Sequence, residues 1–278
     1  MNRDRLRADR LLVERGVFES RARAQAAIAA GLVRADDQPV ARASDLLDRD
    51  ARLEATAPHP FVSRGGVKLV AALDAFGLDP AGRVCLDVGA STGGFTDALL
   101  RAGASHVYAV DVGRDQLHAS LRTDPRVTSL EGVDIRALDR TSIPRAPEFC
   151  TIDVSFISLR LVLPAILPLL APGAALTALI KPQFEAGRAR VGRGGIVRDP
   201  AIHDAVCAEI QTVLTAAGMR VLGLIPSPVT GGDGNREFLI GARLGPEPRT
   251  SKRLTSETPD SENPASDPPT LRPLDPTA

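Results

Sequence analysis

A glycine-rich segment follows directly on an apolar, strand-like run in the first half of the chain. The run is Val84–Val88, and the segment after it comprises Gly89, Ala90, Ser91, Thr92, Gly93, Gly94 and Phe95, near which a helical pattern begins. A glycine-rich turn at the end of a first strand lets a nucleotide-like ligand approach the backbone. A dinucleotide site would have the spacing G-x-G-x-x-G, but Ser91 stands at the middle glycine. The turn therefore favours a nucleotide-like ligand other than NAD.

Three aspartates stand in or after successive predicted strands. Asp87 precedes the turn, where a carboxylate would repel a phosphate but could receive the ammonium of an amino-acid moiety, directly or through water. Asp111 ends the second strand and could accept hydrogen bonds from ribose hydroxyls. Asp134, after the third strand, is a candidate partner for an adenine amino group. A lone aspartate is more often a turn or cap residue, but the series predicts S-adenosylmethionine as the cofactor.

Strand-like runs alternate with helical patterns from about residue 61 to 245. The runs are 84–88, 106–110, 127–130, 149–154, 175–180, 221–225 and 238–242. Strands separated by helices predict right-handed crossovers and a mostly parallel sheet that is covered on both faces. In such sheets ligands bind outside the carboxyl ends of the strands, which is where the three aspartates are expected.

One stretch imitates a membrane span, because residues 161–180 contain no charge and are long enough to cross a bilayer. Pro164, Pro168 and Pro172 would interrupt a lipid-exposed helix repeatedly. We therefore predict a helix from Ser158 to about Leu170, followed by a buried strand from about residue 175 to 180.

The N-terminal segment is basic although the whole chain is neutral, with 34 Lys and Arg against 34 Asp and Glu. Residues 1–34 hold eight Arg and four acidic residues, on two short helical patterns that precede a hairpin-like turn at Asp36-Asp37. This asymmetry predicts contact with RNA, and a merely solvated helical surface is the alternative. The candidate RNA-binding residues are Arg7, Arg10, Arg21 and Arg23.

Composition excludes several other classes of protein. The three cysteines form no C-x-x-C pair and the four histidines lack zinc-hydrolase spacing, so we expect neither a disulfide scaffold nor a metal site. No apolar segment follows the arginine-rich N-terminus, which argues against a secretory signal and predicts a cytoplasmic protein without stable membrane association. With 3% aromatic residues and no Trp, a wide platform for stacking unpaired bases is not expected.

Four charged residues stand in further distinctive motifs. Lys68 lies in SRGGVKL, Asp153 in IDVSFISL, Lys181 in IKPQFE and Glu237 in GNREF. Together with DVGASTGGFT, residues 87–96, these motifs closely resemble the TlyA family over roughly residues 7 to 243. The conjunction is far more specific than any one motif.

The resemblance implies a fold, a reaction and a partner. The fold is α/β, a Rossmann-like methyltransferase sheet of the FtsJ type, mostly parallel with the last strand antiparallel, preceded by a small α+β domain with an α-L RNA-binding motif. The reaction is S-adenosylmethionine-dependent 2′-O-methylation of cytidine ribose in ribosomal RNA, in 23S with 16S as a further candidate. Members of the family are in places called haemolysins, so a membrane-active cytolysin is one alternative. A non-catalytic RNA-binding protein is another.

The family's Lys-Asp-Lys-Glu tetrad falls on Lys68, Asp153, Lys181 and Glu237. We expect Lys181 to act on the ribose hydroxyl, Asp153 and Glu237 to orient it, and Lys68 to complete the charge-paired set. Burial, Lys68 and the cofactor sulfonium favour a neutral Lys181 amine, whereas the two acids favour the ammonium, so the sequence leaves open whether Lys181 is a base or a charged stabiliser of the alkoxide. Two structural salt bridges are the alternative interpretation.

The remaining expectations concern domain limits and secondary features. The predicted domains are 1–57 for RNA binding, a linker at 58–63, the methyltransferase domain at 64–245, and a disordered tail at 246–278 that holds eight of the 22 prolines. Phe95, Phe156 and Phe184 are expected in the core or in a pocket wall. The basic loop at 187–195 either grips RNA phosphates or is solvated.

Overall fold

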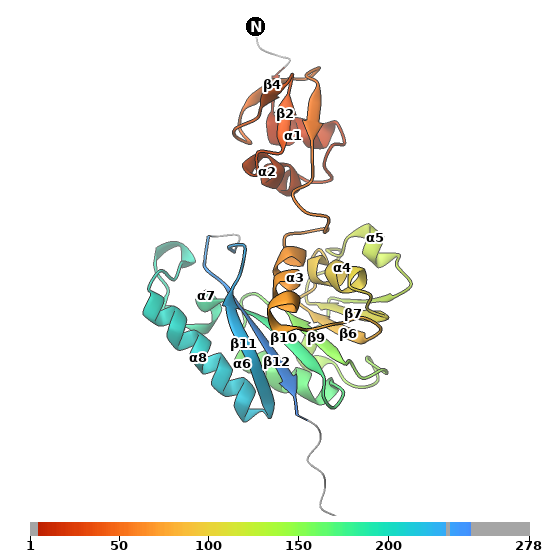
Figure 1. Cartoon of the computed structure of the whole chain (residues 1–278), viewed down its shortest axis with the longest axis vertical. Coiled ribbons are helices and arrows are strands. Elements are labelled where there is room, and N and C mark those ends of the chain that lie inside the picture. Colours follow the sequence, from red (N-terminus) through yellow and green to blue (C-terminus); the bar gives the residue numbers. More distant parts are fainter. Residues whose placement is uncertain (1–4, 232–233, 246–278) are drawn as a thin grey trace, which may run out of the picture. The chain divides into compact units, whose positions relative to one another are not determined.

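The computed structural model describes residues 5–231 and 234–245. The tail predicted at 246–278 lies outside the described residues. The described chain comprises a small N-terminal region and a larger region built around a seven-stranded sheet (Figure 1).

The N-terminal region contains two short helices and two small antiparallel sheets. Its elements are β1 (Arg5–Arg7), α1 (Ala8–Glu14), α2 (Arg21–Ala29), β2 (Val33–Ala35), β3 (Gln38–Pro39), β4 (Leu46–Asp48) and β5 (Leu53–Ala55). Ser20 caps α2 by accepting a hydrogen bond from the Arg23 backbone N–H. Asp36 and Asp37 both have positive φ, 47° and 63°, which matches the tight turn of a two-residue hairpin between β2 and β3. Both predicted helices and the hairpin are present.

All seven predicted strands form one sheet in the larger region. They are β6 (Val84–Val88), β7 (His106–Asp111), β8 (Val127–Glu131), β9 (Phe149–Ile152), β10 (Ala175–Ile180), β11 (Met219–Pro226) and β12 (Phe238–Leu244). Their spatial order is β11-β12-β10-β9-β6-β7-β8, and β12 is antiparallel to both of its neighbours. The last strand is thus antiparallel, as predicted. Strand β9 ends two residues earlier than predicted, so Asp153 and Val154 belong to the following loop.

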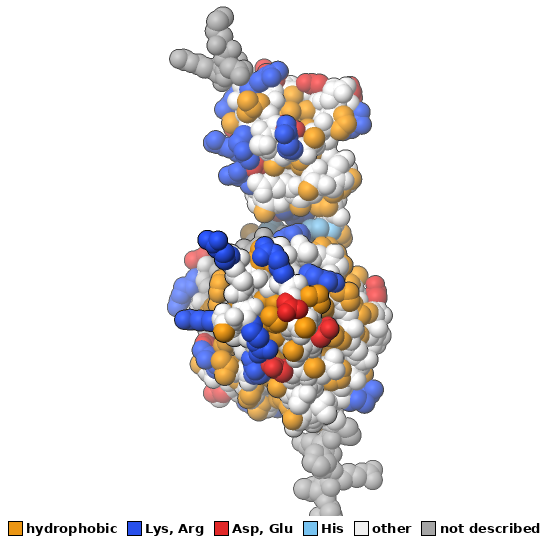
Figure 2. Space-filling view, turned by 90° about the vertical axis from the view of Figure 1, so that its left-hand side faces the viewer, with side chains coloured by type: hydrophobic (Ala, Val, Ile, Leu, Met, Phe, Trp, Pro, Cys, Tyr) orange, Lys and Arg blue, Asp and Glu red, His pale blue; other side chains and the backbone are white. Residues whose placement is uncertain are grey.

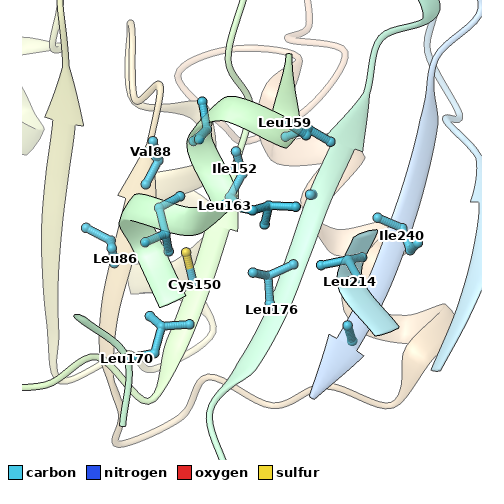
Figure 3. Close-up of a cluster of buried hydrophobic side chains, with 14 of the residues drawn as sticks. Leu86, Val88, Cys150, Ile152, Leu159, Leu163, Leu170, Leu176, Leu214 and Ile240 are labelled. Carbon is cyan, nitrogen blue, oxygen red and sulfur yellow. The ribbon is translucent and has the colours of Figure 1, made fainter. Parts of the chain in front are cut away.

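Helices cover both faces of this sheet. They are α3 (Gly65–Phe76), α4 (Gly94–Arg101), α5 (Ala119–Arg122), α6 (Leu159–Ile166), α7 (Pro182–Glu185) and α8 (Pro200–Ala216). Because side chains alternate along a strand, Leu86 and Val88 pack with α6 and α8, whereas Cys85 packs with α3 and α4. Figure 3 shows the first of these cores, in which strand side chains meet Leu163 of α6 and Leu214 of α8.

The uncharged stretch at 161–180 lies in this core. It forms most of α6, a 3₁₀ turn at Leu167–Leu169, and the fully buried strand β10. The predicted helix and buried strand are therefore present, and Ser158 caps α6 by accepting a hydrogen bond from the Arg160 N–H. Among the described residues, no helix has the length and apolar character needed to cross a membrane.

Candidate active site

A first amine–carboxylate pair joins the ends of two neighbouring parallel strands. Asp153 directly follows β9 and Lys181 directly follows β10, so strand pairing brings the two residues together. Lys181 Nζ lies 2.6 Å from Asp153 Oδ1 and donates a hydrogen bond to Ser155 Oγ at 2.9 Å. Ser155 was not predicted from the sequence, although its place in the Asp153 loop could have indicated it.

A second pair is formed by Lys68 and Glu237. Lys68 Nζ donates a hydrogen bond to Glu237 Oε2 at 2.6 Å, and the residues are only 8% and 4% exposed. The prediction that Glu237 orients Lys181 differs from this arrangement. Ala72 of α3 packs on Leu239 of β12. Lys68 lies one helical turn before Ala72, and Glu237 lies two strand positions before Leu239, so the two side chains share one face of the contact. The packing of α3 on β12 therefore pairs Glu237 with Lys68.

Three members of the tetrad line one small cavity of about 270 Å³. These are Lys68, Asp153 and Lys181, and Glu237 is joined to them through its 2.6 Å pair with Lys68. The cavity wall also contains Ser63, Arg64, Gly65, Ser155 and six residues of the glycine turn, namely Gly89, Ala90, Ser91, Thr92, Gly94 and Phe95. The four charged residues, which come from distant parts of the chain, thus gather beside the predicted ligand turn.

A larger cavity of about 1350 Å³ opens at the carboxyl ends of the same strands. Its volume exceeds the roughly 300–1000 Å³ usual for one small molecule, so it has room for more than a cofactor. Asp111, Asp134 and Asp153 all line it, beside apolar residues such as Val88 and Val133. A carboxylate-rich, partly apolar wall suits hydroxyl and amino groups and a cation better than it suits a phosphate. The donor set therefore fits the predicted sulfonium cofactor.

The predicted cofactor aspartates also organise the loops around this cavity. Asp111 accepts hydrogen bonds from the backbone N–H groups of Ser91 and Gly113, both at 2.7 Å, and so ties the glycine turn to β7. Asp134 caps the 3₁₀ turn at Ile135–Ala137, and the hydrogen bonds from Arg136 hold the pKa of Asp134 below its usual value. Both residues line the cavity, and their contact with a cofactor stays a prediction.

Two glycines of the turn have different surroundings. Gly89 has a φ of +81°, and a Cβ there would lie 2.4 Å from the backbone oxygen of Asp153, so only glycine fits where the turn passes the tetrad. Gly93 was predicted to bind the cofactor, but it lines neither cavity. A Cβ on Gly93 would instead meet the side chains of Leu117 and Leu121. Its φ of +96° starts α4, which makes it a structural residue of the turn.

Asp87 is completely buried and lines neither cavity. Its carboxylate accepts hydrogen bonds from the hydroxyls of Thr96 at 2.7 Å and Thr151 at 2.8 Å. This burial favours the water-mediated form of the predicted contact with a ligand ammonium over the direct form, and the contact itself stays a prediction. Burial raises the pKa of Asp87 to about 6, against the lowering effect of the two hydroxyl donors.

This shift predicts how the Asp87→Asn substitution changes stability with pH. An aspartate whose folded-state pKa lies above its unfolded value of about 4 makes the protein less stable as the pH rises from about 4 to about 6. Asn avoids that cost, and hydroxyls can both donate to and accept from its amide. The variant should therefore exceed the wild type in unfolding free energy by up to ~3 kcal/mol above pH 6, with a shrinking gap below it. Urea unfolding at pH 4.5 and 7.5 checks this, and a variant less stable than wild type at pH 7.5 would contradict it.

The phenylalanines predicted for the core or pocket wall divide between these roles. Phe95 is buried, at 3% exposure, whereas Phe156 is 91% exposed on the rim of the larger cavity. Phe156 has a φ of +63°, unusual for a bulky residue, and its ring lies 5.0 Å from that of Phe184. The early end of β9 explains the exposure, because Phe156 then lies in a loop. Of the basic loop, Arg188 lines the larger cavity, and Arg190 donates to the Ala186 carbonyl.

The predicted RNA-binding arginines lie on β1 and the two helices of the N-terminal region, with Arg7 at the end of β1, Arg10 in α1, and Arg21 and Arg23 in α2. Arg7 and Arg21 both bond to the buried carboxylate of Asp9, Arg23 lies 3.5 Å from Glu19, and Arg10 is exposed. Figure 2 shows Lys and Arg side chains on the surface of this region. These contacts were not foreseen from the sequence, because the helical pattern does not tell which acid a long side chain reaches.

Comparisons with known proteins agree with the geometry. The sequence model of the family described as FtsJ-like methyltransferase matches residues 61–244. YqxC of Bacillus subtilis is 46% identical over 253 residues, covering 90% of each chain. The 16S/23S rRNA (cytidine-2'-O)-methyltransferase TlyA of Mycobacterium tuberculosis is 43% identical over 241 residues, covering 86% of this chain and 90% of the relative. A solved structure from Streptococcus thermophilus, described as a possible hemolysin, has a TM-score of 0.70 at 41% identity and covers 87% of this chain and 89% of its own.

Proposed function

The chain belongs to the FtsJ-like methyltransferase family, and from this premise we propose that it methylates the ribose 2′-oxygen of cytidines in ribosomal RNA with S-adenosylmethionine as donor. The observation that carries the proposal is the pair of amine–carboxylate contacts at the small cavity, Lys181 with Asp153 and Lys68 with Glu237, both at 2.6 Å. They lie beside a cleft whose acidic wall fits the donor.

The cleft residues would hold the donor by its polar groups. When bound, S-adenosylmethionine supplies a methyl group activated by its sulfonium. Asp111 is suited to the ribose hydroxyls, and Asp134 to the adenine amino group. The glycine turn, through Gly89, Ala90, Ser91, Thr92, Gly94 and Phe95, forms the wall on the side of the tetrad. Asp87 and Gly93 would support this wall indirectly, Asp87 through its hydrogen bond with Thr96 of α4 and Gly93 as the residue that precedes α4.

Lys181 is the residue that would act on the nucleophile. A ribose hydroxyl is a poor nucleophile, so transfer requires that its proton be taken up or that its developing negative charge be stabilised. Asp153 and Ser155 fix Lys181 Nζ at the cavity wall, where the amine can do either. A single-turnover rate that rises with pH indicates the neutral amine as base, and a flat profile indicates the charged stabiliser.

Lys68 and Glu237 would set the electrostatic surroundings of that amine. Lys68 brings a second positive charge to the cavity wall, and Glu237 compensates it from the buried side. Such preorganised charges are most effective where water is excluded. The Lys68–Glu237 pair would therefore add a fixed positive charge at the cavity wall, while Asp153 remains the partner of Lys181.

Ribosomal RNA would be held by the basic surfaces. Arg7, Arg10, Arg21 and Arg23 of the N-terminal region are suited to phosphates, and Arg188 lines the larger cavity. A ribosomal RNA partner supports the proposal that the protein acts in the cytoplasm. The cytolysin alternative loses its basis in the sequence, because the uncharged stretch at 161–180 is packed in the core.

Mapping of 2′-O-methyl groups tests the proposal in cells. Ribosomal RNA from cells that contain the gene should carry at least one 2′-O-methylcytidine that is missing when the gene is deleted. Complementation with the wild-type gene should restore it. Identical maps with and without the gene would overturn the proposed function.

A further inference from the structure

Asp9 is a buried acid in a region that the charge pattern predicts to bind a polyanion. Its side chain is 0% exposed and makes contacts with three residues of the N-terminal region. Arg7 Nε and Nη2 donate to its two carboxylate oxygens at 3.1 and 3.2 Å. Arg21 Nε and Nη2 donate to Oδ2 at 3.2 and 2.7 Å, and Gln25 Nε2 does so at 2.7 Å. These bonds, that from Arg7 foremost, hold the pKa of Asp9 well below its usual range.

Asp9 therefore fixes the two guanidinium groups but leaves part of each exposed and able to donate further hydrogen bonds. The side chains of Arg7 and Arg21 remain 41% and 55% exposed. Each turns Nε and Nη2 toward Asp9, and among the described residues the Nη1 group of each donates to no other atom. One carboxylate between two guanidiniums leaves the cluster with a net positive charge. Two half-exposed, planar donors with one shared anchor have the form of a clamp for an oxyanion.

We infer that Asp9 is a positioning residue, which holds Arg7 and Arg21 as a preformed clamp for one phosphate of the RNA backbone. The inference rests on the proposed function, since that function supplies the RNA. A free arginine must lose the freedom of its long side chain when it binds. Here Asp9 has already fixed both side chains, so the acid strengthens binding to a polyanion although its charge alone would weaken it.

The direction in which Asp9→Asn changes RNA affinity separates this positioning role from a purely electrostatic effect. In the full chain, the substitution removes a negative charge, so a purely electrostatic surface would bind RNA more tightly. The clamp predicts the opposite: affinity for an in-vitro 23S ribosomal RNA transcript should fall at least ~10-fold at about 0.1 M salt, and the slope of log affinity against log salt should decrease by about 1. Filter binding over a range of salt concentrations measures both.

Asp48→Asn is the matched control. Asp48 lies in the same region and pairs with Arg5 at 3.2 Å, but its side chain is 57% exposed, so the same charge is removed without a buried anchor. The control should bind the transcript as tightly as the wild type or more tightly. If Asp9→Asn behaves like this control, the clamp is overturned.

Arg21→Lys decides the matter if Asp9→Asn fails to fold. Lysine keeps the charge but loses the fork that bonds to Asp9 through two nitrogens. The clamp predicts at least ~5-fold weaker binding, and wild-type affinity would overturn it. These assays measure RNA affinity and not methyl transfer. Tight binding by the Asp9 and Arg21 variants therefore removes only the clamp, whereas a wild-type chain that neither binds nor methylates the RNA removes the proposed function as well.

Discussion

Lys181→Ala should slow methyl transfer from S-adenosylmethionine to ribosomal RNA by about 10²–10⁴-fold in a single turnover, the usual contribution of a positioned acid–base group. The substitution removes the amine that Asp153 and Ser155 hold at the cavity wall. The wall on the donor side, with Asp111 and Asp134, is left intact. Affinity for S-adenosylmethionine, measured by calorimetry, should therefore change by less than about threefold.

Ser155→Ala is the graded control for this result. It removes one hydrogen bond to Lys181 Nζ and leaves the amine and its Asp153 partner in place. A hydrogen bond is worth about 0.5–1.5 kcal/mol between neutral groups and about 1.5–3 kcal/mol to a charged group, so the loss in rate should be roughly 2- to 10-fold for a neutral amine and roughly 10- to 100-fold for a charged one. Near-normal turnover by Lys181→Ala would show that the amine does not take part in the reaction.

Lys68→Met should lower the unfolding free energy by about 3–5 kcal/mol, because it leaves the Glu237 carboxylate buried and unpaired. Replacing both residues, in Lys68→Met/Glu237→Met, removes the unpaired charge and should restore most of the stability. Urea unfolding of the two variants and the wild type measures this recovery.

Activity of the double variant separates a functional pair from a structural salt bridge. If the charges of Lys68 and Glu237 serve the reaction, the stably folded double variant should remain at least about tenfold slower than the wild type in a single turnover. A pair that only stabilises the fold would give a stable double variant with full activity. That outcome would reduce the functional tetrad to Asp153 and Lys181.

The positions of the strands could be predicted from the sequence because local signals agree there. Val84–Val88 and 175–180 are buried apolar runs bounded by turn residues, and the structure places β6 and β10 at these positions. The gathering of the Asp153 and Lys181 side chains followed as well, since neighbouring parallel strands end at one edge of a sheet. The identity of all four charged residues came instead from the family's motifs.

Side-chain partners could not be predicted in the same way. Glu237 pairs with Lys68 because α3 packs on β12, a tertiary contact that no spacing along the chain encodes. Asp87 turns to Thr96 and Thr151 and away from both cavities, because a residue within a strand can face either side of the sheet. The exposure of Phe156 depends on where β9 ends, and strand ends are the least certain part of a prediction from sequence.

Nucleoside analysis of RNA methylated in vitro tests the reaction and the role of Lys181 in it most directly. The purified chain is incubated with methyl-labelled S-adenosylmethionine and ribosomal RNA, and the digested nucleosides are separated and identified by mass. We expect the label in 2′-O-methylcytidine with the wild-type chain and, at a time within the wild-type single turnover, at least ~100-fold less of it with Lys181→Ala. Label on a base would contradict ribose methylation, and equal 2′-O-methylcytidine from the Lys181→Ala protein would contradict the role of Lys181.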